Sequence, residues 1–244
     1  MINAILLIAG NSLRFNEDND NKLKQYVKIN NIELFLYPLK TLLSISDIDN
    51  IILVVRKDYI NVTRNIIVGN NDIFKDSNKD LTNIHIIEGG FSRQESVFNA
   101  LKYIKFNLFN DLDKDLVLVL DGARALVSKE IIIDNINAFI KDKEVKGTTT
   151  YLDSTDSLML VENNSITSYV DRDKIKRIET PQTFRFNVLY KAHLSSTRIR
   201  NDDLSLVLGK DPFTKIKLIK GDQFNFKVTT KEDLLLMKEI VENK

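Results

Sequence analysis

Two segments near the start of the chain carry residues that could hold a polyphosphate. Residues 9–14 read Ala-Gly-Asn-Ser-Leu-Arg, directly after an apolar run, and Lys24 follows ten positions later. A glycine at the end of a strand lets backbone N–H groups approach phosphate oxygens. Arg14 and Lys24 could then place two cations on those oxygens. Strand, glycine and basic residue recur in many proteins, so a plain surface loop explains this pattern equally well.

A paired glycine, Gly89 and Gly90, opens a segment that leads from an apolar run into a helical pattern. Ser92, Arg93 and Ser96 fall in the first turn of the expected helix. Hydroxyl groups and backbone donors at such a place can recognise the edge of a base or a ribose. A tight turn followed by a helix cap is the alternative, and the local pattern does not choose between the two.

Charged residues also follow or interrupt two later apolar runs. Asp121 and Arg124 come after the run 116–120, and Lys227 lies within the strand-like run 224–228. Open α/β folds bind ligands at the carboxyl edge of the sheet. Asp121 could therefore meet Mg²⁺ or a substrate hydroxyl, and Arg124 a phosphate. An exposed lysine without a function is the alternative for Lys227.

Strand and helix patterns alternate along the part of the chain that carries these segments. Continuous apolar runs at 3–9, 51–55, 84–87 and 116–120 predict buried parallel strands. Helical spacing occurs around 34–43, 97–104 and 131–140, the last with Ser128 as its N-cap. This order predicts an α/β fold with a doubly wound, mostly parallel sheet that is covered on both faces. We expect one domain over residues 1–244.

The pattern changes after residue 147. Three short strand patterns, 148–153, 157–161 and 166–170, follow one another without a helix and predict a β-arm at about 148–170. Such an arm is marginally stable alone and tends to pack on a partner subunit. Strands at 216–219 and 224–228 and a last helix from Lys231, capped by Thr230, complete the expected elements.

Composition excludes several classes of protein. Lys and Arg number 35 against 34 Asp and Glu, without the basic excess usual in proteins that bind nucleic acid or membrane surfaces. With no cysteine and only two histidines, neither a thiolate site nor a His-rich metal site can form. The apolar run near residue 1 is too short to span a bilayer. We expect a soluble, cytoplasmic protein that binds neither nucleic acid nor membranes.

Taken together and in this order, the segments resemble the methylerythritol-phosphate cytidylyltransferase family and its close relative, the ribitol-phosphate cytidylyltransferases. The resemblance covers about residues 3–240. It rests on G-G-x-x-R-x-x-S-V-x-N-A-L at 89–101, V-D-R at 170–172, T-P-Q-x-F at 180–184 and N-x-K-V-T at 225–229. Each match is weak alone, whereas all of them in family order are specific.

The resemblance implies a Rossmann-like nucleotidyltransferase fold and a homodimer whose β-arms exchange between subunits. It implies an enzyme that uses CTP, with Mg²⁺ as cofactor, and an alditol phosphate as second substrate. Arg14 and Lys24 would stabilise charge on the CTP phosphates, and Arg172 and Lys227 would position the alditol phosphate, which makes these four the expected catalytic residues. CTP would be held by Ala9, Gly10, Asn11, Gly89, Asp121 and the loop 90–96, which contains Gly90, Arg93 and Ser96. The alditol phosphate would also meet Asp121, Arg124, Ser157 and Thr180, some from the partner subunit, with Asp121 as a candidate metal ligand.

Departures from the family pattern leave alternatives open. Two features favour the ribitol branch: the segment 57–60, and Met159 at a position where the methylerythritol branch often has lysine. The segment 201–205 favours the methylerythritol branch instead. We expect conversion of methylerythritol 4-phosphate to its CDP derivative, a step of isoprenoid precursor synthesis. The alternatives are a ribitol-5-phosphate cytidylyltransferase that makes CDP-ribitol and a non-catalytic nucleotide-binding homologue. The other departures are Ser12 for a glycine, Leu23 and Ala125 for prolines, Leu120 for a histidine and Ser157 for a threonine.

Overall fold

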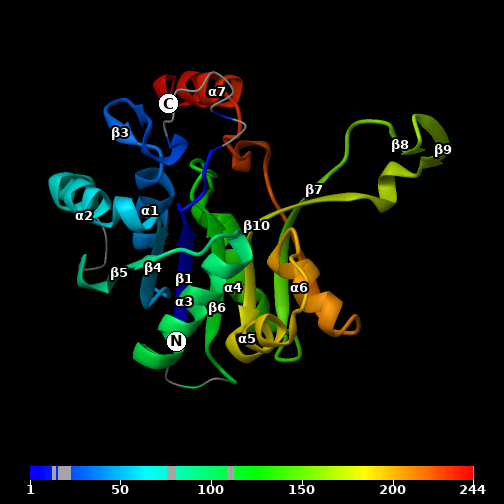
Figure 1. Cartoon of the computed structure of the whole chain (residues 1–244), viewed down its shortest axis with the longest axis horizontal. Helices are drawn as coiled ribbons and strands as arrows, with labels where there is room; N and C mark the ends of the chain where they lie inside the picture. Colours follow the sequence, from blue (N-terminus) through cyan, green and yellow to red (C-terminus); the bar gives the residue numbers. More distant parts are fainter. Residues whose placement is uncertain (13–14, 16–22, 76–80, 109–110, 112, 244) are drawn as a thin grey trace.

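The computed structural model describes residues 1–12, 15, 23–75, 81–108, 111 and 113–243. A seven-stranded sheet runs through its middle in the order β11-β7-β10-β6-β1-β4-β5 (Figure 1). All neighbouring strands in it are parallel except β10, which runs antiparallel to both β6 and β7. The strands are β1 (Ile2–Leu7), β4 (Asn50–Val55), β5 (Ile84–Glu88), β6 (Leu116–Asp121), β7 (Gly147–Asp153), β10 (Lys176–Arg185) and β11 (Ile216–Lys220).

Helices cover both faces of this sheet. Along β1, Ala4 and Leu6 pack into the core on the side of α1, whereas Ile5 packs into the core on the side of α3, because successive side chains of a strand point to opposite faces. A strand buried on both faces reads as a continuous apolar run, so the predicted doubly wound α/β architecture is confirmed. One face carries α1 (Leu36–Leu43), α2 (Ile60–Gly69) and α4 (Lys129–Lys141), and the other carries α3 (Arg93–Asn107), α5 (Phe186–Ser195) and α6 (Asp203–Lys210).

Two short hairpins stand apart from the central sheet, each with a pair of asparagines at its turn. β2 (Lys28–Ile29) and β3 (Ile32–Glu33) flank Asn30 and Asn31, and β8 (Leu158–Glu162) and β9 (Ser165–Val170) flank Asn163 and Asn164. All four asparagines have φ between 48° and 64°, as two-residue hairpin turns require. The remaining short elements are 3₁₀ helices at Lys24–Tyr26, Lys57–Tyr59, Asn71–Phe74, Leu81–Asn83, Arg172–Lys174 and Gln223–Asn225.

The β8–β9 hairpin projects from the body at the far ends of β7 and β10 (Figure 1). It corresponds to the second and third strands of the expected arm. The first strand differs: residues 148–150 are buried in the central sheet between β10 and β11, so the arm that stands free is shorter than 148–170. The hairpin exposes apolar side chains to solvent, namely Met159, Leu160, Val161, Ile166 and Tyr169.

The predicted strand at 224–228 is wrong. The carboxylate of Asp222 accepts hydrogen bonds from the backbone N–H groups of Phe224 and Asn225, which closes a 3₁₀ turn in place of a sheet ladder. The chain then continues as an extended segment, and Val228 donates one backbone hydrogen bond to the carbonyl of Ala123. Lys227 therefore lies on a connecting segment outside the sheet.

Helix α7 (Lys231–Glu242) follows this segment and begins with the expected cap. The Thr230 hydroxyl accepts from the N–H of Asp233, and the Asp233 carboxylate accepts from the N–H groups of Thr229 and Thr230. This reciprocal arrangement satisfies donors that the first turn leaves free. It also anchors the end of the segment that carries Lys227. Within the described residues, no helix is long and apolar enough to cross a membrane.

We expect Thr230→Ala to lower the free energy of unfolding by about 1 kcal/mol, because the first turn of α7 loses its side-chain cap. Urea denaturation measures the change. Thr230→Ser keeps the hydroxyl group and should stay within a few tenths of a kcal/mol of the parent protein. Equal stability of the alanine variant and the parent would contradict the role of the cap.

Candidate active site

A cavity of about 1100 Å³ opens at the carboxyl ends of β1, β4, β5 and β6. Its strand β1 lies between β4 and β6, and the chain leaves β1 towards one neighbour and returns later to the other. Doubly wound sheets bind ligands at this kind of switch point. Ten of the predicted site residues line the cavity: Ala9, Gly10, Asn11, Lys24, Gly89, Gly90, Arg93, Ser96, Asp121 and Lys227.

A serine and a glutamine hold the described ends of the loop after β1, around residues 10–12 and 24–25. Ser12 has φ of 56°, a conformation that favours glycine, which explains why the family pattern has glycine here. The Ser12 hydroxyl donates to the side-chain oxygen of Gln25 (3.1 Å) and accepts from the N–H of Lys24 (3.0 Å). Gln25 in turn donates to the carbonyl of Gly10 at 3.3 Å. These bonds bring Lys24 to the cavity, while Arg14 lies outside the described residues.

The loop between β5 and α3 is tightly packed. A Cβ atom on Gly89 would lie 2.8 Å from the Cβ of Ala9, and one on Gly90 would overlap the side chain of Glu95. The Ser96 hydroxyl accepts from the N–H of Gly90 at 3.0 Å, and Ser92 caps α3 as its N-cap residue. The segment is therefore both a tight turn with a cap and a wall of the cavity.

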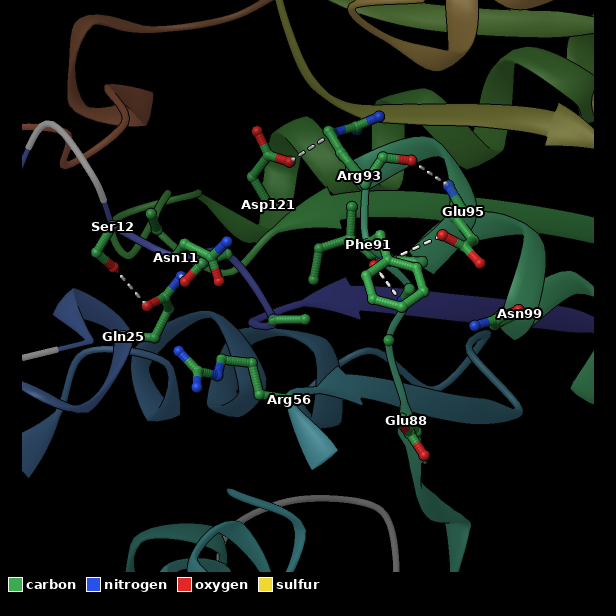
Figure 2. A pocket seen from close by; sticks show the side chains of 18 of the residues that line it. Asn11, Ser12, Gln25, Arg56, Glu88, Phe91, Arg93, Glu95, Asn99 and Asp121 are labelled. Atoms are coloured by element: carbon green, nitrogen blue, oxygen red, sulfur yellow. Dashed lines mark hydrogen bonds and ion pairs between the residues drawn. The ribbon is translucent and has the colours of Figure 1, made fainter. Parts of the chain in front are cut away.

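Asp121 lies at the centre of the charged groups. Its Oδ1 accepts from Arg93 Nε at 3.2 Å, and its Oδ2 accepts from Lys227 Nζ at 2.7 Å; Figure 2 shows Arg93 and Asp121 pointing toward each other. Burial raises the pKa of this carboxyl group, but Lys227, Arg93 and Arg124 outweigh burial and hold the pKa well below its usual range. Asp121 is therefore ionised at neutral pH and keeps two cations in place.

Arg93 is held from its other side by Asp203. Its NH1 donates to Oδ2 of Asp203 at 2.7 Å, and the Asp203 side chain is only 2% exposed. Burial raises the pKa of Asp203, but Arg93 and His193 outweigh it and lower the pKa. Because the guanidinium group is planar and rigid, two carboxylates fix its orientation. Asp203 was not predicted from the sequence, since nothing local to α6 indicates a contact with a residue 110 positions earlier.

Two predicted residues lie behind Asp121 and do not line the cavity. The Thr180 hydroxyl accepts from the N–H of Asp121 at 3.1 Å. Arg124 is buried, donates to the carbonyl of Asn225 at 2.6 Å and pairs with Glu179 at 3.4 Å. Burial raises the pKa of Glu179. Both predicted residues thus support the loop around Asp121 in this chain.

The two predicted residues on the arm are not brought to the cavity by a single chain. Ser157 directly precedes β8, and Arg172 follows β9, where its NH1 donates to the carbonyl of Thr155 at 3.1 Å. Their roles stay predictions. Phe91, Ser92 and Glu95, which belong to the loop 90–96 expected to hold CTP, also line the cavity. The lining further contains residues that were not predicted to bind a substrate, and their places directly after β4 could have indicated some of them: Gln25, Arg56, Lys57, Asp58, Asn99 and Thr229.

Metal binding by the protein was expected only at Asp121. In the part of the chain that the structure describes, no group of three or more His, Asp or Glu side chains could hold a metal ion. Both oxygens of Asp121 already accept from protein cations, which does not favour this carboxylate as a resident metal ligand. Mg²⁺ in nucleotide enzymes uses one or two carboxylates together with substrate phosphates. Asp121 as a metal ligand stays a prediction.

Residues 2–243 match the model of the 2-C-methyl-D-erythritol 4-phosphate cytidylyltransferase family. The chain belongs to this family. A cytidylyltransferase of that name from Thermosipho africanus is 36% identical over 241 residues, 97% of this chain and 96% of the relative. One from Thermotoga neapolitana is 35% identical over 239 residues, 97% of this chain and 95% of the relative.

The crystal structure of the 4-diphosphocytidyl-2C-methyl-D-erythritol synthase from Anaerococcus prevotii has the same fold. It superposes with a TM-score of 0.80 at 28% identity and covers 99% of this chain and 96% of its own. The resemblance in the sequence, the nucleotidyltransferase fold and the enzyme class are thereby confirmed. The methylerythritol branch of the cytidylyltransferases is favoured over the ribitol branch, since the matched family and the relatives named here all belong to the former.

We expect Asp121→Asn to lower the free energy of unfolding at pH 7 by about 2 kcal/mol, less than for a fully buried ion pair because Lys227 is partly exposed. A carboxyl group whose pKa is lowered by folding stabilises the protein above its unfolded pKa of about 4 and loses that contribution as the pH falls towards its folded pKa. The difference in the free energy of unfolding between the parent protein and Asp121→Asn should therefore become smaller as the pH falls from 5 to 3.

Urea denaturation at several pH values measures this difference. Asp134→Asn is the matched control, because Asp134 is an exposed carboxylate on α4 and should leave stability nearly unchanged throughout. A difference for Asp121→Asn that does not depend on pH would contradict the paired, ionised carboxylate.

Proposed function

We propose that this protein transfers CMP from CTP to the phosphate of 2-C-methyl-D-erythritol 4-phosphate and releases pyrophosphate. The observation that carries the proposal is the set of cations, Lys24, Arg93 and Lys227, along one cavity at the switch point of the sheet. Membership of the cytidylyltransferase family supports the choice of both substrates.

The reaction needs charge stabilisation more than proton transfer. A phosphate monoester has a second pKa of about 6 and is largely a dianion at neutral pH, so its oxygen can attack the α-phosphorus of CTP without a general base. A bond forms from that oxygen to the α-phosphorus, the bond from the α-phosphorus to the bridging oxygen breaks, and pyrophosphate leaves with the electron pair. Positioning and cations supply nearly all of the catalysis in such transfers.

Each part of the cavity suits one part of CTP or of the second substrate, the alditol phosphate. Lys24, together with Arg14, would neutralise charge on the triphosphate. The residues Ala9 to Asn11 and the loop from Gly89 to Ser96 would hold the ribose and base through backbone groups and the Ser96 hydroxyl. Lys227 would bind the attacking phosphate, since its ammonium group has three donors and spends one on Asp121.

A homodimer is part of the same proposal. The β8–β9 hairpin exposes apolar side chains and carries Arg172 at its base, away from the cavity of its own chain. A partner subunit's cavity would bury those side chains and bring Ser157 and Arg172 to the alditol phosphate. Arg124 and Thr180 would meet the same substrate or hold Asp121 in place for it.

Mg²⁺ would bind together with the phosphates of CTP, since both carboxylate oxygens of Asp121 accept hydrogen bonds from Arg93 and Lys227. The chemistry that the ion would supply there is neutralisation of negative charge on the triphosphate and on the pyrophosphate that leaves. Because CTP is an intracellular metabolite, we place the enzyme in the cytoplasm within this proposal.

Pyrophosphate release tests the proposed reaction directly. With CTP and Mg²⁺, we expect release with methylerythritol 4-phosphate and none above background with ribitol 5-phosphate. Release with ribitol 5-phosphate alone would assign the other branch. No release with either substrate, from protein that still binds CTP, would support the non-catalytic alternative and overturn the proposal.

We expect Lys227→Ala to lower kcat/KM by about 10²- to 10³-fold, as loss of one charge-stabilising donor does in other enzymes. The steady-state rate of pyrophosphate release measures this effect, and the melting temperature shows that the variant is folded. Lys191→Ala removes an exposed lysine of α5 and should leave kcat/KM unchanged. An active Lys227→Ala variant would remove Lys227 from the catalytic set.

A further inference from the structure

The side chain of Phe91 stands in solvent at the rim of the cavity. It is 102% exposed, more than any other large apolar side chain among the described residues, and it belongs to the cavity lining. Figure 2 shows its ring at the side of the cavity that also carries Glu95 and Asn99. A fully exposed phenyl ring leaves its apolar area in water, which folding normally avoids. Its place at the mouth of a ligand cavity suggests that a ligand covers it.

The backbone beneath this ring is fixed. The N–H of Phe91 donates to the carboxylate of Glu95 at 2.8 Å, and the N–H of Glu95 donates to the hydroxyl of Ser92 at 3.1 Å. This arrangement resembles a capping box, except that the glutamate reaches one residue beyond the N-cap. Gly90 adds to the rigidity, because its Cα packs so closely on Glu95 that no Cβ would fit. The exposed ring is therefore held by an ordered loop.

The chemistry of the cavity identifies what would cover the ring. Lys24, Arg93 and Lys227 supply cations for phosphate groups, and a phenyl ring gains nothing from a phosphate. A nucleobase, in contrast, offers a planar face, and stacking of bases on aromatic side chains strengthens the binding of nucleotides. We propose that Phe91 is a stacking platform for the base of the bound nucleotide. This inference rests on the proposed use of CTP.

Stacking on Phe91 would strengthen the binding of a nucleotide without selecting which base it carries. Every base has a face that can stack, so Phe91 would strengthen the binding of cytidine and uridine nucleotides alike. Selection of cytosine would fall to groups that can hydrogen-bond to its edge, such as the backbone around Gly89 and Gly90 and the hydroxyl of Ser96. The platform adds nothing to the binding of a ligand without a base.

Substitution at residue 91 tests the platform through substrate binding. We expect Phe91→Ala to raise the KM for CTP about 5- to 150-fold, with kcat within about twofold of the parent. Phe91→Tyr keeps an aromatic face and should restore the parent KM. Inhibition by inorganic tripolyphosphate should not change, since that probe has no base. Phe213→Ala is the matched control, because Phe213 is 92% exposed and lies outside the cavity lining.

The absence of tryptophan from the chain allows an independent optical test. In Phe91→Trp the single indole should change its emission when CTP or CMP is added, and it should not respond to tripolyphosphate. Phe213→Trp should respond to none of these ligands. Sedimentation of Phe91→Ala shows whether the ring contributes to association of subunits.

Several outcomes would overturn the platform while leaving the proposed reaction intact. One is an unchanged KM for CTP in Phe91→Ala together with a silent indole in Phe91→Trp, in a parent enzyme that turns over CTP. Others are a fall in kcat and melting temperature together, which would indicate a structural role, or a change in subunit association. A parent protein that neither binds nor turns over CTP would instead refute the proposed function itself.

Discussion

The ion pairs of Asp121 are the interaction on which the site depends. A buried carboxylate is costly unless it is paired and hydrogen-bonded, and Asp121 is paired with Arg93 and Lys227. These two cations come from α3 and from the segment before α7, which lie 134 positions apart in the chain (227 − 93). The carboxylate at the end of β6 therefore draws the two halves of the cavity wall together, and the cations that could serve a phosphate are held ready by a group of opposite charge.

The central sheet supplies the geometry for that arrangement. Parallel strands end at the same edge, so the loops after β1, β5 and β6 meet although they are far apart in sequence. The antiparallel strand β10 interrupts this order and returns the chain from the arm to the core. It also carries Thr180, whose hydroxyl accepts from the backbone of Asp121. The strand that leads out of the arm is thus hydrogen-bonded to the backbone of the residue that carries the central carboxylate.

Much of the fold and of the candidate site could be predicted from local sequence patterns, and the incorrect predictions have physical reasons. The continuous apolar runs of β1, β4, β5 and β6 predict buried strands, and the residues that follow them are then expected at one edge. The prediction of a strand at 224–228 was wrong because the carboxylate of Asp222 binds the backbone N–H groups of Phe224 and Asn225, which a sheet would otherwise pair. The start of the arm was misplaced because the buried part of β7 consists mainly of threonines, which form no apolar run that would mark it as a strand of the central sheet. Asp203 escaped prediction because its contact with Arg93 depends on packing between α3 and α6.

The serine at position 12 has a consequence for how this protein can vary. A glycine would adopt the left-handed backbone there unaided, whereas Ser12 relies on its hydrogen bonds with Gln25 and Lys24. The backbone conformation at residues 10–12 thus depends jointly on two side chains thirteen positions apart. A mutation at residue 25 would be more damaging beside Ser12 than beside a glycine, so the residue at one of these positions constrains which residues the other can tolerate.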